Sequence, residues 1–234
     1  MLPVLTRSSS CHRIAGVAVL LVAVLGMLAG ASPVSPVSAA TAASGPVAGG
    51  SSQWITVIAR SHSVAYARLV AYQRAGGHWV RVFGPWTARV GYNGIARPGA
   101  KREGDGRTPS GTYGFGFFFG VLANPGVRFP YRRAHPYDVW DDDPASPRYN
   151  EWVDERYVNP GANPEPMDQR PAYDYAAVIA YNTKRVPGLG SAIFLHVGTG
   201  SATAGCVSLP RADLLRILRW LRPADRPQIA ITAR

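Results

Sequence analysis

Apolar and β-branched residues recur in short runs along most of the chain, with polar positions between them. The runs at residues 54–58 (WITVI), 66–72 and 78–83 have the length and composition of strands. Because Gly76 and Gly77 separate the last two runs, we expect a hairpin within an antiparallel meander. Four further strands are predicted around 88–92 and at 176–182, 191–196 and 228–232.

One segment, residues 210–221, has helical periodicity instead. Its predicted buried stripe consists of Leu214, Leu215, Ile217, Leu218 and Leu221. Pro210 suits the first turn of a helix, and Pro223 ends it. A chain with 25 Gly and 20 Pro favours strands and loops, which excludes an all-α fold. The predicted fold class is therefore mainly β with one C-terminal helix.

The segment 120–172 has a different character, because it holds nine of the twenty prolines together with many acidic and aromatic residues. Regular elements cannot extend far through so many prolines, so we expect long loops that form a lid or the wall of a groove. Asp141, Asp142 and Asp143 lack the alternating spacing and the central Gly of a calcium loop. We predict that these acids are solvated or paired with Arg.

The N-terminal residues 1–40 have the pattern of an export signal. Arg7 and Arg13 are followed by an apolar run and then by small residues, with plausible cleavage after Ala31 or Ala40. The uncharged stretch is just long enough to span a bilayer, so an uncleaved membrane anchor is the alternative. We expect an exported protein, either secreted or held at the cell envelope.

Two boundaries follow from composition. Residues 41–52 are rich in Ala, Gly and Ser, which predicts a flexible linker, and one domain is expected at 53–234. Its 47% hydrophobic and 17% charged residues exclude wholesale disorder. Two cysteines cannot form a disulfide framework or a four-cysteine zinc site.

The chain is basic, with 25 Lys and Arg against 14 Asp and Glu and a formal charge of +11, or +9 without residues 1–40. Such a balance permits nucleic-acid binding. Export argues against that partner and favours the anionic cell wall.

The segment 193–210 carries the candidate chemistry. An apolar strand is predicted to deliver His196 at its end, and a loop of small residues returns Cys206 shortly before the helix. A helix N-terminus and an imidazolium both lower the pKa of a nearby thiol, so we expect a reactive thiolate with His196 as its base. Backbone amides beside Gly205 are candidate donors to an oxyanion. The alternative is an inert buried cysteine beside a histidine that only caps a strand.

These residues resemble the L,D-transpeptidase catalytic domains of bacterial cell-wall synthesis. Thr203, Gly205 and Cys206 match the motif that supplies the nucleophile in that family, and His196 matches its base. The block at 101–115 (KREGDGRTPSGTYGF) resembles the turn that precedes the catalytic half. Blocks at 142–150, 181–182 and 190–191 resemble an exported, actinobacterial-type branch.

Three positions depart from the family pattern, and one of them is Val197, which stands where a Gly often follows the first His. Ala204 stands where the family has a second His, and Ser208 stands where a polar Asn or Arg helps to hold the donor substrate. The essential pair is kept, so the departures bear on substrate recognition and on the choice between transfer and hydrolysis.

The resemblance implies an antiparallel, β-sandwich-like fold and an acyltransferase that acts on peptidoglycan stem peptides. Cys206 would form a thioester with release of the terminal D-alanine, and an amine of a neighbouring stem would resolve it. His196 would serve as base, Gly205 and Thr203 would support the oxyanion loop, and further residues would bind substrate. These binding residues are Ser208, Tyr181 and Asn182. The expected protein is a monomer without metal or cofactor.

Three other functions stay open. Water as the acceptor would make the protein an L,D-carboxypeptidase, and loss of turnover would leave a wall-binding module. A sortase-like transpeptidase is a further alternative, in which His135 and Arg211 would assist Cys206.

Overall fold

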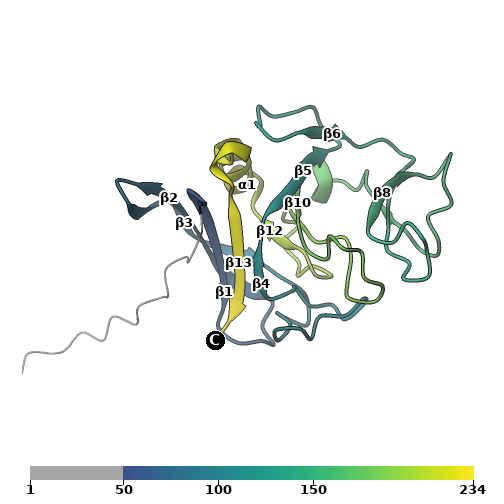
Figure 1. The fold of residues 1–234 in the computed structure, drawn as a ribbon, viewed down its shortest axis with the longest axis horizontal. Coiled ribbons are helices and arrows are strands. Elements are labelled where there is room, and N and C mark those ends of the chain that lie inside the picture. The colour runs from purple at the N-terminus through teal and green to yellow at the C-terminus, as the bar shows by residue number, and fades with distance from the viewer. Residues whose placement is uncertain (1–49) are drawn as a thin grey trace, which may run out of the picture. The chain divides into compact units, whose positions relative to one another are not determined.

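The computed structural model describes residues 50–234; the predicted export signal and most of the predicted linker lie outside the described residues. The described part contains a ten-stranded sheet and a three-stranded sheet (Figure 1). In spatial order, the large sheet consists of β4 (Gly111–Tyr113), β13 (Gln228–Ala233), β1 (Gln53–Ala59), β2 (Tyr66–Ala75), β3 (His78–Arg89), β12 (Val207–Leu209), β11 (Phe194–Val197), β10 (Ala176–Ile179), β5 (Phe115–Gly120) and β6 (Tyr131–Arg133). The small sheet consists of β8 (Glu151–Asp154), β7 (Asp138–Asp141) and β9 (Glu165–Pro166).

The predicted mainly β class with one C-terminal α-helix is confirmed, but the strand pairing is mixed rather than wholly antiparallel. β1 pairs with β13, β11 with β12, and β5 with β6 in parallel. Parallel neighbours need a crossover connection, and the loop between β11 and β12 is one of these crossovers. This loop therefore carries the chain from the end of β11 back to the level where β11 begins, and β12 starts there.

The predicted hairpin is present as β2 and β3. Gly76 and Gly77 have φ of 55° and 82°, a region that residues with a Cβ seldom adopt. The strand expected around 88–92 is the end of β3, which stops at Arg89. Gly91 then forms an isolated bridge to Thr203, which ties the end of this hairpin to the loop before Cys206.

The proline-rich segment 120–172 is more regular than expected. It contains β6 to β9, each two to four residues long, because prolines prevent longer strands but permit short ones between them. The ring of Trp140 in β7 packs edge-on against the ring of Phe194 in β11, with centroids 5.0 Å apart. This aromatic contact attaches the small sheet to the middle of the large one.

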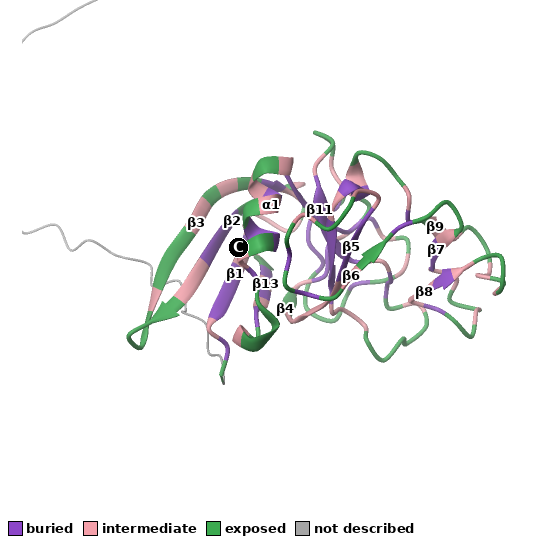
Figure 2. Cartoon of the chain, turned by 90° about the horizontal axis from the view of Figure 1, so that it is seen from above, coloured by how far each residue is buried: buried purple, intermediate pink, exposed green. Residues whose placement is uncertain are grey.

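Helix α1 (Arg211–Trp220) contacts β11 and β12. Leu214, Ile217 and Leu218 are fully buried, and each contributes about 1.5–3 kcal/mol by leaving water. Leu215, predicted to be buried, is partly exposed because the stripe is narrower than the sequence indicated. Burial is greatest in the central strands, and all four residues of β11 are buried (Figure 2). Within residues 50–234, none of the helices is long and apolar enough to cross a membrane.

Candidate active site

Strand register brings the two candidate catalytic residues to one face of the sheet. His196 lies opposite Ser208 in the parallel pair of β11 and β12. Alternate residues of a strand share a face, so Phe194 and His196 point to the same side as Cys206 and Ser208. The backbone N–H of Phe194 donates to the Cys206 Sγ at 3.3 Å. These four residues form what we call the thiol wall.

His196 is held in the tautomer that a general base requires. Its Nδ1 lies 2.9 Å from the carbonyl oxygen of Val197, an acceptor that cannot donate, so Nδ1 carries the ring hydrogen and Nε2 has the free lone pair. The sequence predicted that His196 ends its strand, but it is the third of four residues in β11 and is 8% exposed. Burial lowers its pKa from 6.5 to about 4, so the imidazole is neutral at pH 7.

The thiol is also neutral, which corrects the expected low pKa. Burial raises the pKa of Cys206 from 9.0 to about 12, and the N–H of Phe194 offsets only part of that effect. Two structural reasons explain the error. The side chain is 8% exposed, and β12 separates Cys206 from the helix, which begins at Arg211. The Sγ donates to the carbonyl of Ala192 at 3.2 Å, and within the described chain it forms no hydrogen bond with His196.

A cavity of about 500 Å³ opens beside the thiol wall. His196, Cys206 and Ser208 line it, together with Thr199 and residues 201–205 of the loop between β11 and β12. Three carboxyl groups from other parts of the chain line it as well. These are Glu103, Asp142 and Glu165, which we call the acidic wall. A nucleophile, a base and a set of carboxyl groups thus line one open cavity.

This arrangement can be compared with known proteins. A family model, YkuD, described as the L,D-transpeptidase catalytic domain, matches residues 53–229, well over half of the chain. The chain belongs to the L,D-transpeptidase catalytic domain family. Among solved structures, the helical cell shape determining protein Pgp2 from Campylobacter jejuni matches with 17% identity and a TM-score of 0.36. That match covers 77% of this chain and 48% of the Pgp2 chain, so this chain spans about half the length of Pgp2. No curated protein matches the sequence.

Within this L,D-transpeptidase domain, Thr203 and Gly205 hold the loop that carries the thiol. The Thr203 Oγ1 donates to the Cys206 carbonyl at 2.7 Å and accepts from the Gly205 N–H at 3.2 Å. The Cys206 carbonyl also accepts from the Thr108 Oγ1 at 3.1 Å. The 101–108 loop is thereby fastened to the backbone of the nucleophile.

Ser208 lies within the cavity, and its hydroxyl lacks a partner. The side chain is 1% exposed, yet its Oγ forms no hydrogen bond inside residues 50–234. An unpaired buried hydroxyl costs about 1–3 kcal/mol. A polar atom of a bound molecule would relieve that cost.

Tyr181 and Asn182, also predicted to bind substrate, do not line this cavity. Their side chains support the turn after β10: the Tyr181 OH donates to the carbonyl of Leu189 at 2.5 Å, and the Asn182 amide donates to Val186 and Gly190. Asn182 also has a positive φ of 49°, as a turn requires. A direct contact with substrate stays a prediction for both.

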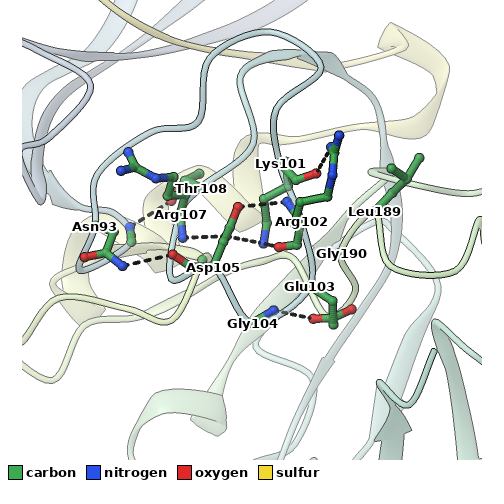
Figure 3. A network of polar contacts seen from close by, with 12 residues as sticks. Asn93, Lys101, Arg102, Glu103, Gly104, Asp105, Arg107, Thr108, Leu189 and Gly190 are labelled. Carbon is green, nitrogen blue, oxygen red and sulfur yellow. Dashed lines mark hydrogen bonds and ion pairs between the residues drawn. The ribbon is translucent and has the colours of Figure 1, made fainter. Parts of the chain in front are cut away.

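The 101–108 loop is a folded polar network rather than a simple turn (Figure 3). Lys101, only 6% exposed, donates to the Asp105 carboxylate at 2.7 Å and to the Arg102 carbonyl at 2.5 Å. Glu103 faces away from this pair and accepts hydrogen bonds from Ser191 and Tyr149. The Glu103 carboxylate of this loop therefore lines the cavity as a hydrogen-bonded group, while the charge of Lys101 is paired with Asp105.

In the part of the chain that the structure describes, none of the aspartates at 141–143 pairs with Arg; Asp143 is partly exposed to solvent, in line with the prediction, whereas Asp141 and Asp142 are not freely solvated. Asp141 is fully buried and accepts from Ser146 and from the backbone of Asp143. Asp143 accepts from two backbone N–H groups of neighbouring turns. Asp142, between them, lines the cavity. Within residues 50–234, no three His, Cys, Asp or Glu side chains are grouped as metal ligands.

Sequence reasoning missed Tyr173, which contacts His196, and its neighbour Asp174, which pairs with two arginines. The ring of Tyr173 packs edge-on against the imidazole, with centroids 5.6 Å apart. Asp174, fully buried, pairs with Arg170 at 2.6 Å and with Arg211 of α1. Only a weak signal, a Tyr-Asp pair before β10, was visible in the sequence, because no motif links Asp174 to Arg170 or to Arg211.

The same ion pairs bear on the sortase-like alternative. Arg211 contacts Asp174 rather than the cavity, and His135 does not line the cavity either. The residues that this alternative requires are therefore not assembled around Cys206.

Proposed function

We propose that this protein is an exported cysteine acyltransferase that acts on peptidoglycan stem peptides. The family to which the chain belongs acts on such peptides. The observation that carries the proposal is the presence of Cys206 and His196 on one sheet face beside a cavity of about 500 Å³. The export signal in residues 1–40 and the actinobacterial-type branch stay predictions of the sequence.

Acylation begins from a neutral pair. The Cys206 thiol gives its proton to Nε2 of His196 as the sulfur attacks the carbonyl carbon after the third residue of a tetrapeptide stem. The imidazolium then protonates the departing amine, and D-alanine leaves. The Gly205 N–H is already bonded to Thr203, so the Cys206 amide is the candidate donor to the oxyanion.

The thioester has two possible fates. An amine of a neighbouring stem gives a cross-link between third residues, and water gives a shortened stem, as in an L,D-carboxypeptidase. We favour transfer, because one wall of the cavity is lined by carboxylates that attract a cationic amine.

The test is an incubation of the protein with purified disaccharide-tetrapeptide muropeptides. The proposal predicts cross-linked dimers and free D-alanine, and neither product with Cys206→Ala. Tripeptide muropeptides without dimers would identify a carboxypeptidase. No product and no thioester with a folded protein would identify a wall-binding module and contradict the proposal.

A further inference from the structure

The three carboxyl groups of the acidic wall are not equivalent. Glu103 accepts from the Ser191 Oγ at 2.7 Å and from the Tyr149 OH. Glu165 accepts from the Tyr173 OH at 3.0 Å and from the Gln169 amide. The carboxyl of Asp142 is partly buried, and within the described residues it accepts a hydrogen bond only from its own backbone N–H and none from another residue. Asp142 is thus the member of the wall that is free to take a partner.

The position of Asp142 is fixed by packing rather than by loop conformation. The ring of Trp140, two residues earlier, packs edge-on against the ring of Phe194 of the thiol wall. Its Nε1 donates a hydrogen bond to the Asn150 Oδ1 at 2.9 Å. The same Asn150 oxygen accepts from the backbone N–H of Ala192, whose carbonyl accepts from the Cys206 Sγ. One chain of contacts therefore connects the free carboxyl to the nucleophile.

The electrostatics of this end of the cavity favour a cation. Lys101, the one basic residue other than His196 that lines the cavity, is paired with Asp105. The titratable groups that face Asp142 are Glu103, Glu165, Asp141 and Tyr173. Burial, with these neighbouring carboxylates, raises the pKa of Asp142 from 3.8 to about 7. A bound ammonium group would relieve this repulsion.

A hydroxyl group that lines the same cavity also lacks a polar partner within residues 50–234. The Ser208 Oγ is buried and unpaired on the thiol wall. A molecule that fills the cavity would thus place a polar atom beside Ser208 and a positive charge beside Asp142.

We propose, on the basis of the acyltransferase function above, that the acidic wall binds the ammonium group of the acceptor and that the Asp142 carboxylate takes its proton. The neutral amine then attacks the thioester carbon. A C–N bond forms, the C–S bond breaks, and the second proton lost by nitrogen passes through His196 to the departing sulfur. Asp142 later releases its proton to water, so the thiol, the imidazole and the carboxylate return to their starting states.

The experiment separates formation of the thioester from its resolution. The acyl-enzyme is formed with tetrapeptide muropeptide, and its decay is followed by intact mass with ethylamine, which is cationic at neutral pH, or hydroxylamine, which is uncharged. For Asp142→Asn we expect thioester formation within about twofold of wild type and decay with ethylamine slowed by roughly 10²-fold, the usual effect of a positioned proton acceptor. Decay with hydroxylamine should change little.

Asp168→Asn is the matched control. It removes the same charge three positions from Glu165, at a carboxyl that does not line the cavity. We expect wild-type decay with both amines. If Asp142→Asn does not form the thioester, decay with the two amines is measured for Glu165→Gln instead. This variant lowers the negative charge of the acidic wall and leaves Asp142 in place.

The outcomes distinguish this inference from the function on which it rests. If the wild-type protein forms no thioester, the proposed function fails. If the thioester forms and Asp142→Asn resolves it with ethylamine at the wild-type rate, the acceptor site is overturned and the acyltransferase remains. Equal slowing with both amines would also overturn it, since a general distortion of the cavity affects charged and uncharged nucleophiles alike.

Discussion

The thiol wall and the acidic wall face the same cavity but are built in different ways. The thiol wall consists of alternate residues on two adjacent parallel strands, so its geometry follows from strand register. The acidic wall gathers Glu103, Asp142 and Glu165 from segments far apart in the chain. Regular structure thus positions the thiol and the imidazole, and loops and short strands far apart in the chain bring the carboxyl groups together.

Burial disfavours the charged form of ionisable side chains on both walls, to different degrees. On the thiol wall, burial lowers the pKa of His196 and raises that of Cys206, so both are neutral at pH 7. On the acidic wall, burial raises the pKa of Glu165 and raises that of Asp142 to about 7, while the carboxylates of Glu103 and Glu165 accept hydrogen bonds. The predictions below test whether the thiol wall behaves as this comparison requires.

The largest effect is expected from His196→Gln. Loss of the base should slow acylation of Cys206 by roughly 10²–10⁴-fold, the usual contribution of a positioned acid–base group. The rate of thioester formation measures it. His62→Gln, His78→Gln and His135→Gln are the controls, since none of these residues lines the cavity. If His135→Gln abolished acylation and His196→Gln did not, the assignment of the base would be wrong.

A second prediction concerns the resting thiol. A pKa of about 12 instead of 9.0 means that Cys206 carries roughly 10³-fold less thiolate at pH 7. Iodoacetamide should therefore alkylate Cys206 far more slowly in the native protein than in the urea-unfolded protein. Mass spectrometry measures both rates. Faster alkylation in the native state would show that the thiol is already activated without substrate.

The third prediction is a pH dependence of stability. The folded-state pKa of His196 lies below its unfolded value, so its contribution is present above pH 6.5 and is lost as the pH falls through 4. Between pH 6.5 and 4 the free energy of unfolding should fall by about 3 kcal/mol more for wild type than for His196→Gln. Urea denaturation of both proteins measures the difference. A difference that does not change with pH would contradict a buried, neutral His196.

The smallest effect is expected at the ion pairs of the buried Asp174. Asp174→Asn removes a buried charge between Arg170 and Arg211, and should lower the free energy of unfolding by about 1–3 kcal/mol, because both arginines can return to water. Arg148→Gln, which breaks the exposed pair with Glu151, should cost less than about 0.5 kcal/mol. Equal losses in the two variants would show that the Asp174 pairs do not support the fold.

The sequence predicted the thiol wall better than the acidic one. The strand before His196, the helix after Cys206 and the β2–β3 hairpin follow from local periodicity and turn residues. The three-residue strand β12 is too short for any pattern to reveal, and so the distance from Cys206 to the helix was misjudged. The thiol pKa depends on burial by the whole fold, which no local pattern reports.

The acidic wall could not be predicted, because it depends on tertiary contacts. Asp142 reaches the cavity through the packing of Trp140 on Phe194, two aromatic residues 54 positions apart in the numbering. The charge run at 141–143 was visible in the sequence, but only the small sheet determines which of the three acids faces the cavity.

The most direct test of the account is to locate the acyl group after incubation with tetrapeptide muropeptide. The protein is quenched in acid, digested and mapped by mass spectrometry. The account predicts a stem acyl group on the peptide that contains Cys206, with loss of one D-alanine, and no such adduct with Cys206→Ala. An adduct on any other residue, or equal product formation by Cys206→Ala, would contradict the central claim that the thiol wall carries the chemistry.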